Sequence, residues 1–244
     1  MRTVRHCLRL TVLAVALAAG TGACGSSGGS AGPAGQGTSA DPLAGLNSRQ
    51  IAQRAVAGTE AAPSVRVTGS GTDSGQPITI DLTLIRGKGC QGTLSTSSMG
   101  SVKVVYNGTT VWLLPDAKFY RSQNVPASAL SVLNGKYLQV KANGSSLGSL
   151  GQLCTLSKLL SQFTPHAGTA KGIATTVDGQ RAVKITDKTS SGYAYVSDEA
   201  DPVLLRIQKP GAGGGLVKFS YTGNRLAITP PPASQVIDGS KYGF

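Results

Sequence analysis

The strongest constraint on the fold is an alternation of apolar and polar residues that recurs between turn signals. It is clearest in PITIDLTLIRG, residues 77–87, where every second residue is aliphatic. A period of two places apolar side chains on one face of a β-strand and polar side chains on the other. The segment SVKVVYNGTTVWLL, residues 101–114, adds Asn107-Gly108 between two β-rich runs, which is the signal for a two-residue hairpin turn. The sequence therefore predicts an antiparallel sheet.

The rest of the chain predicts more strands and a few helices. Further strands are expected in SVRVTGSG, AKFYRS, GQRAVKIT, GYAYVS, PVLLRIQK, LVKFSYT and NRLAIT. Helical spacing predicts one helix over residues 47–57, capped by Asn47 or Ser48 and stopped by Gly58, and two more within 125–133 and 146–163. PPPASQVIDG is expected to end in a short helical turn or loop. The expected fold class is α+β: a single curved antiparallel sheet, a half-barrel of about eleven strands, with two or three helices on its concave side.

The first 24 residues are typical of an export signal. Three arginines lie in the first nine residues, and the apolar stretch 10–19 that follows is too short to span a bilayer core of about 30 Å. The sequence Gly-Ala before Cys24 resembles the lipobox of bacterial lipoproteins, in which the cysteine becomes the mature N-terminus and carries diacylglycerol. The alternative is an ordinary secretory signal with an incidental Cys24.

The segment after Cys24 favours lipidation. Ten of the sixteen residues in 25–40 are Gly or Ser, a composition that gives a flexible tether. A tether is useful when one end is fixed, and two acyl chains hold a protein stably on a membrane. We therefore expect a signal peptide over 1–23, a lipidated Cys24 and tether over 24–46, and one domain over 47–244. The expected location is the outer face of the cytoplasmic membrane.

The remaining cysteines predict a disulfide. Of four cysteines, Cys7 leaves with the signal peptide and Cys24 is taken by lipid, so Cys90 and Cys154 remain in an exported domain. A bond between them closes a loop of about 65 residues, which stabilises the fold by roughly 4 kcal/mol in the chain-entropy model. A redox or metal-binding role is disfavoured, because the chain has no C-x-x-C motif and no histidine near either cysteine.

Charge and motifs argue against several classes of function. The net charge is +12, but the basic residues are scattered and no basic run carries interleaved aromatics, so nucleic acid is not an expected partner. His166 is the single histidine after the signal peptide, and the acidic cluster Asp198, Glu199 and Asp201 is interpreted as an exposed turn. KTSSG, residues 188–192, lacks the S-x-x-K nucleophile that accompanies K-T-G in penicillin-binding enzymes. We therefore expect no enzyme activity, no metal and no cofactor.

Several segments together resemble a known family. They are the Gly-Ala-Cys24 motif, the tether, the opening helix, SVRVTGSG, the Gly-Cys at 89–90, LCTLSKLLSQF at 153–163 and the closing PPPASQVIDGSKYGF. The pattern is similar to LolA/LolB-like surface lipoproteins of actinobacteria, nearest to the LppX/LprG type. The resemblance covers nearly the whole mature domain. It implies a half-barrel closed by helices, with acyl chains held between sheet and helices.

This resemblance gives two hypotheses about function. In the first, a monomeric lipid carrier binds acyl chains in a cavity. Its candidate lining residues are Ile78, Ile80, Leu82, Leu84, Val102, Val104 and Leu113 from the sheet and Leu153, Leu160 and Phe163 from the covering helix. In the second, the same residues form a filled core, and the domain is a ligand-free interaction or sensor module that recruits a protein or an envelope polymer. Periodicity does not separate the two, because both bury the same face.

Overall fold

The structure is a computed structural model that describes residues 41–73, 75–142, 147–161, 169–189, 191–223 and 226–242. These residues belong to one compact unit, which spans 40–244. The predicted signal peptide, Cys24 and most of the tether lie outside the described residues, as do Phe163 and His166. Within the described part, none of the helices combines the length and the apolar character needed to cross a membrane.

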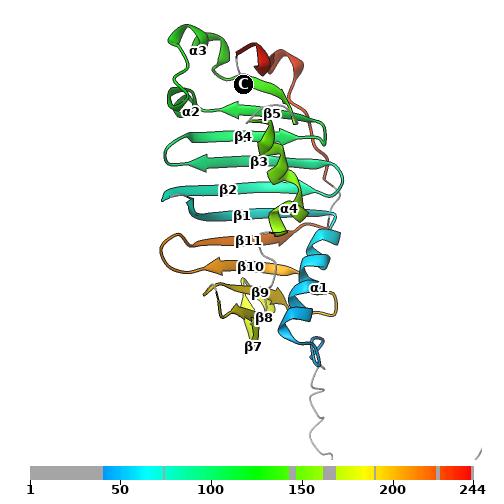
Figure 1. Ribbon diagram of the computed structural model, residues 1–244. Coiled ribbons are helices and arrows are strands. Elements are labelled where there is room, and N and C mark those ends of the chain that lie inside the picture. Colours follow the sequence, from blue (N-terminus) through cyan, green and yellow to red (C-terminus); the bar gives the residue numbers. More distant parts are fainter. Residues whose placement is uncertain are drawn as a thin grey trace, which may run out of the picture. The chain divides into compact units, whose positions relative to one another are not determined.

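Twelve strands form one open sheet in the described part of the chain (Figure 1). Their order across the sheet is β12-β6-β5-β4-β3-β2-β1-β11-β10-β9-β8-β7. The bounds are β1 Ser64–Asp73, β2 Gln76–Ile85, β3 Gly89–Thr96, β4 Gly100–Tyr106, β5 Thr110–Pro115, β6 Tyr137–Lys141, β7 Thr169–Val177, β8 Gln180–Asp187, β9 Tyr193–Ser197, β10 Leu204–Lys209, β11 Gly215–Tyr221 and β12 Val236–Asp238. All neighbours pair antiparallel except β12, which pairs parallel with β6. The predicted α+β class with a large antiparallel sheet is confirmed.

Four α-helices and three 3-10 helices accompany the sheet in the described residues. Their bounds are α1 Ser48–Ala61, α2 Ala117–Ser122, α3 Ala127–Leu133, α4 Leu156–Ser161, η1 Gly148–Cys154, η2 Ala233–Gln235 and η3 Gly239–Tyr242. Helices α1 and α4 lie across the same face of the sheet. Helices α2 and α3 lie near strand β5, toward the β12 edge of the sheet (Figure 1). We call the face that carries α1 and α4 the inner face.

The inner face is apolar because the strand registers place the apolar residues of neighbouring strands opposite one another. Val65, Val67, Leu82 and Leu84 face one another across β1 and β2, where Val67 pairs with Leu82 and Val65 with Leu84. The same rows continue into β4 and β5, where Val104 pairs with Leu113. These residues belong to one contiguous hydrophobic core that runs from Leu133 at one end to Val183 near the other. The alternation in PITIDLTLIRG thus has the structural meaning that the sequence predicts.

Helix α1 begins where the sequence predicts but continues further. The side-chain oxygen of Asn47 accepts from the Gln50 backbone N–H at 2.9 Å, and the Gln50 side chain accepts from the Asn47 N–H at 3.0 Å. This reciprocal pair is a capping box. Gly58 does not stop the helix, which ends at Ala61. A β-carbon built on Gly58 would lie 2.3 Å from the carbonyl oxygen of Pro202, so this glycine is a point of close approach to the β9–β10 loop.

Two predicted strands are wrong. AKFYRS forms helix α2, because the Asp116 side chain caps it by accepting from the Phe119 N–H at 2.7 Å. The buried side chains of this helix are Phe119 and Tyr120, which are adjacent rather than alternating. The described part of NRLAIT, residues 226–229, is not a strand either. The C-terminal segment instead reaches the sheet later, through β12.

The predicted boundary between tether and domain is also displaced. Asp41–Leu46 was assigned to the tether, yet Leu43 is fully buried in the core. The Lys171 ammonium group donates to the Leu43 carbonyl oxygen at 3.0 Å and lies 3.6 Å from the Asp41 carboxylate. The buried Leu43 side chain and the polar contacts of Lys171 therefore hold the chain against β7 before α1 begins.

Candidate functional site: the inner face and the α1–α4 seam

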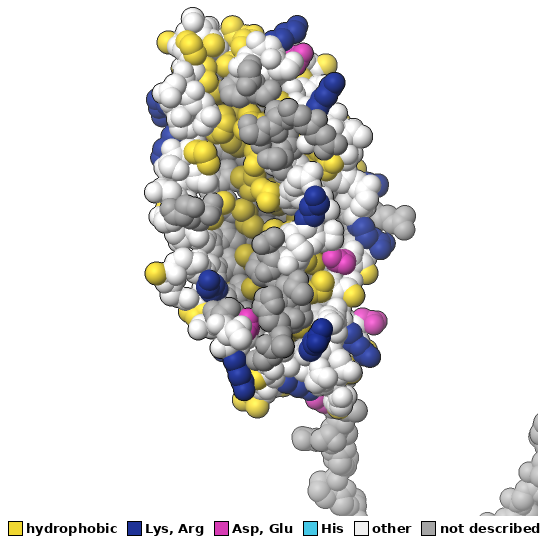
Figure 2. All heavy atoms as spheres, viewed as in Figure 1, with side chains coloured by type: hydrophobic (Ala, Val, Ile, Leu, Met, Phe, Trp, Pro, Cys, Tyr) yellow, Lys and Arg dark blue, Asp and Glu magenta, His cyan; other side chains and the backbone are white. Residues whose placement is uncertain are grey.

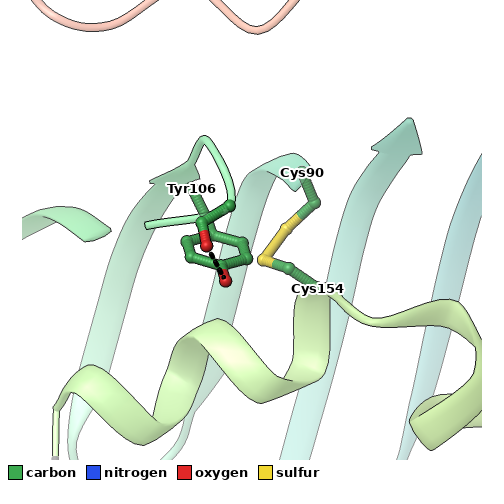
Figure 3. Close-up of a disulfide and its surroundings, with 4 residues drawn as sticks. Cys90, Tyr106 and Cys154 are labelled. Atoms are coloured by element: carbon green, nitrogen blue, oxygen red, sulfur yellow. Dashed lines mark hydrogen bonds between the residues drawn. A yellow bond between two sulfur atoms is a disulfide. The ribbon is translucent and has the colours of Figure 1, made fainter. Parts of the chain in front are cut away.

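The disulfide positions the covering helices on the inner face. Cys90 is the second residue of β3, Cys154 is the last residue of η1, with one residue between it and α4, and their sulfur atoms are bonded (Figure 3). The two Cα atoms are 5.1 Å apart, and both side chains are buried. Cys154 thus lies at the junction of two short helices rather than inside one long helix. Tyr106 of β4 lies beside the bond, and its hydroxyl donates to the Gly108 carbonyl oxygen at 2.7 Å (Figure 3).

The structure brings most of the candidate cavity residues together. Leu82, Leu84, Val102, Val104, Leu113 and Leu160 are all buried in the one core cluster. Leu82 and Val104 are 1% exposed and Leu113 is 0% exposed, so these three positions are close-packed. Leu153, by contrast, is 38% exposed on η1 and does not cap the sheet. Ile78 and Ile80 are half-buried, and Phe163 lies outside the described residues.

A second row of inner-face residues is only partly covered. The registers place Ile207, Val217, Gly69, Ile80 and Leu94 opposite one another from β10 to β3. The four side chains of this row are half-buried and pack against the core. We call Ile207, Val217, Ile80 and Leu94 the open row. Figure 2, seen from the side of α1 and α4, shows hydrophobic side chains reaching the surface in a band beside the helices.

The seam between α1 and α4 is hollowed in two adjoining places. One cavity of about 360 Å³ lies between the end of α1, the η1–α4 junction and the β2–β3 turn. Val65, Leu84, Tyr106 and Leu156 are among its apolar lining residues. A second cavity of about 300 Å³ lies between the two helices, and it shares Glu60 and Ser157 with the first. The helix pair therefore leaves access to the edge of the inner face.

The opposite, outer face of the sheet is polar and held by ion pairs. Arg66 of β1 and Asp81 of β2 are diagonal neighbours in the alternating polar positions, and their side chains approach to 2.7 Å. The hydrogen bond from the Arg66 guanidinium holds the pKa of Asp81 below its ordinary value. Asp178 binds Arg206 at 2.9 Å and Lys218 at 3.4 Å, and the hydrogen bond from Arg206 is the main reason that the pKa of Asp178 is lowered. The sheet is thus amphipathic, with these ion pairs on the face opposite the hydrophobic core.

Side chains suited to chemistry do not gather in the described residues. No group of three His, Cys, Asp or Glu side chains there is placed to hold a metal ion. Asp198 of the acidic cluster is buried rather than part of an exposed turn, and its carboxylate binds Arg181 at 2.7 Å. Its other carboxylate oxygen has no hydrogen-bond partner among the described residues. The interpretation of this cluster as fully exposed is therefore wrong for Asp198.

Sequence reasoning missed three of the four open-row residues. Ile207 and Val217 lie in strands that were predicted, and the alternation in LLRIQK and LVKFSYT was a sufficient signal for both. Leu94 lies in β3, a strand of mostly Gly, Ser and Thr whose weak pattern gives little indication of a strand. The seam was also missed, because Glu60 and Ser157 come together only through the packing of α1 and α4.

The comparisons with known proteins agree with this architecture. No protein-family model matches the sequence, and a search of curated proteins finds no match. The fold, a large open sheet with a few helices over its apolar face, is shared with solved structures. One solved structure that the chain is similar to is LprF from Mycobacterium bovis, with a TM-score of 0.53 over 75% of this chain and 96% of LprF. The two sequences are 14% identical, so the likeness is one of fold.

Proposed function

We propose that the protein is an exported, membrane-anchored lipoprotein whose inner face binds acyl chains in the cell envelope. The observation that carries the proposal is the open row: four aliphatic side chains from four strands that are aligned across the sheet and only half-buried. Exposed apolar surface that is contiguous rather than scattered is typical of a binding site. An acyl chain is a ligand of the right chemistry, since each buried methylene contributes about 0.8 kcal/mol.

The fold supports acyl chains over other apolar ligands. The sheet has one polar face with ion pairs and one apolar face that helices cover only in part. The apolar face is a long surface, which suits a long, unbranched acyl chain. The resemblance found in the sequence implies the same ligand class, and the likeness to LprF extends over most of the chain. The anchor at Cys24 is the second part of the proposal, and it rests on the lipobox and tether alone.

The test is to measure lipid on the full-length protein. We expect native mass spectrometry of the protein, purified from the bacterial envelope, to show additional masses of co-purified lipid. Ile80→Asn and Leu94→Asn should lose most of that lipid, because each puts an amide into the open row. Thr79→Asn is the matched control, since Thr79 is exposed on the outer face of the same strand. Leu82 and Val104 are poor test positions, because a larger side chain there would cost about 1–3 kcal/mol in a close-packed core.

Two results would contradict lipid binding. One is a parent protein that carries no lipid and takes up none from vesicles of its own host's lipids. The other is equal lipid loss in Thr79→Asn and Ile80→Asn. A parent without lipid that nevertheless binds an apolar partner through the open row would instead support the ligand-free interaction domain.

A further inference from the structure

The larger seam cavity has two cations at its mouth. Arg86 and Lys88 of the β2–β3 turn both line the cavity of about 360 Å³, and both are exposed. Neither side chain makes an ion pair with any described residue. The volume falls in the range of small-molecule sites, which is about 300–1,000 Å³.

The turn that carries these cations has a fixed backbone. The Arg86 N–H donates to the Pro63 carbonyl oxygen at 3.1 Å, and the Lys88 N–H donates to the Ile85 carbonyl oxygen at 3.0 Å. Gly87, between the two cations, has a φ of 69°, in the left-handed region that glycine adopts without steric cost. The two basic side chains therefore start from a backbone that is held in place beside the cavity.

The wall behind the cations is largely apolar, with Thr155 and Ser157 as neutral polar side chains and with one charged exception. Val65 and Leu84 are inner-face residues, and Leu156 begins α4, so the floor of the cavity continues the apolar surface of the sheet. The exception is Glu60, a half-buried carboxylate near the end of α1. The charged lining residues are thus two cations and one anion, arranged beside an apolar floor. This combination fits an amphiphile whose polar end is negatively charged.

We propose that this cavity recognises the acidic headgroup of a lipid, a phosphate or a carboxylate, with Arg86 and Lys88 as its binding residues. The proposal rests on the proposed function, because the apolar part of the ligand would lie against the edge of the inner face. It adds a selectivity that acyl-chain binding alone does not supply. Glu60 opposes the acidic group and sets an upper limit on the affinity.

The experiment compares two lipids that have the same acyl chains, one with an anionic phosphoglycerol headgroup and one with a neutral hydroxyl in its place. The full-length protein is titrated with dioctanoyl phosphatidylglycerol and with dioctanoylglycerol, both below their aggregation concentrations. We expect the acidic lipid to bind more tightly, and Arg86→Gln and Lys88→Gln each to weaken it by about tenfold, the size of one charge-assisted hydrogen bond. Binding of the neutral lipid should not change. Added salt should reduce the preference, because the cations are exposed.

Two further variants make the test specific. Glu60→Gln should tighten binding of the acidic lipid, which is the opposite sign to the cation variants and is not explained by misfolding. Lys103→Gln makes the same charge change on the outer face of β4, where the side chain is exposed, and should leave both affinities as they are.

The outcomes separate this proposal from the one it rests on. If both lipids bind equally well to the parent, the headgroup site is overturned while acyl-chain binding stands. If neither lipid binds, the proposed function fails as well. Inorganic phosphate alone is the last arm: if it binds as tightly as the phospholipid, the cavity is a free-anion site and the assignment to a lipid headgroup is overturned.

Discussion

At the residue scale, Thr59 joins three elements through one hydroxyl. Its Oγ1 donates to the Ala55 carbonyl oxygen at 2.7 Å, accepts from the Leu204 N–H at 3.0 Å and lies 3.0 Å from the Tyr221 hydroxyl. Thr59 is completely buried, and the Tyr221 hydroxyl donates to the Leu204 carbonyl oxygen at 2.5 Å. Helix α1 is thereby bonded to β10 and β11 in a region that excludes water.

Replacing this hydroxyl by a methyl group is expected to destabilise the fold. Thr59→Val should lower the free energy of unfolding by about 1–3 kcal/mol, because the buried Leu204 N–H loses its acceptor. Urea denaturation of parent and variant measures the change. Thr59→Ser should recover most of the loss, and Thr79→Val on the exposed outer face should change stability by less than about 0.5 kcal/mol. Equal stability of Thr59→Val and the parent would show that the network contributes nothing.

A buried tyrosine predicts how stability changes with pH. Burial raises the pKa of Tyr120 to about 12, above the value near 10 of an unfolded tyrosine. The unfolded state therefore loses its proton first, and stability should fall as pH rises from about 10 toward 12. Burial also raises the pKa of Tyr221, which acts in the same direction. Tyr120→Phe should flatten the alkaline fall, measured as unfolding free energy against pH. Tyr242→Phe, at an exposed site, is the control, and an equal effect there would contradict the assignment.

At the scale of elements, α1 depends on a residue that normally weakens helices. Gly58→Ala would improve helix propensity by about 1 kcal/mol, yet its β-carbon would lie 2.3 Å from the Pro202 carbonyl oxygen. We expect the clash to dominate and the variant to be less stable by about 1–3 kcal/mol. The neighbouring Ala57→Gly, at an exposed position, should cost about 1 kcal/mol through propensity alone. Thermal unfolding compares the two, and a stabilised Gly58→Ala protein would refute the close approach.

The η1–α4 segment depends on its covalent link to β3. Replacing Cys90 and Cys154 together by serine should lower stability by about 4 kcal/mol, because the bond joins residues that are 64 positions apart. The double variant avoids leaving one reactive thiol. Denaturant unfolding with and without reductant gives the difference. Labelling of both cysteines in the folded, unreduced protein would show that the bond is absent from the native state.

The elements also show what local sequence can and cannot predict. Strands with clear alternation, such as β2 and the β4–β5 hairpin at Asn107-Gly108, were predicted correctly because one buried face imposes a period of two. AKFYRS has a strand-like composition, but the Asp116 side chain caps the segment and favours a helix. This N-cap was not recognised in the sequence. Strand β7 was missed because most of its residues are exposed at the sheet edge, including Ile173 at 87%. Its sequence therefore carries no pattern of burial.

At the scale of the whole molecule, the candidate site could be predicted only in part. The sequence identified which side chains would face inward, but the choice between a filled core and an open surface depends on where α1 and α4 rest. Leu82 and Leu113 are buried whereas Ile80 is half-buried, although all three are inner-face aliphatics. The parallel pairing of β12 with β6 was not predicted either, since its partner residues are about a hundred positions apart.

The proposed lipidation of Cys24 predicts that the protein is held on the membrane. Cys24→Ala should release the protein into the medium or leave it as an uncleaved precursor, because a protein without its acyl chains has no stable hold on the bilayer. Cell fractionation and the mass of the mature protein measure the result. A variant that fractionates with membranes as fully as the parent, at the same mature mass, would refute lipidation at Cys24.

If the protein is exported as proposed, the strand order sets the sequence in which its parts can fold. Strands β1 to β6 pair with their neighbours in the chain and form one continuous ladder, and β7 to β11 form a second. The two ladders meet only where β11 pairs with β1, and the first is closed at its far edge only when β12 arrives. Because a chain leaves the translocation channel from its N-terminus, the first ladder can assemble while the second is still unexported. Until then β1 and β6 are both unpaired edges, the surfaces on which sheets aggregate. The last residues to emerge therefore protect the first ones to fold.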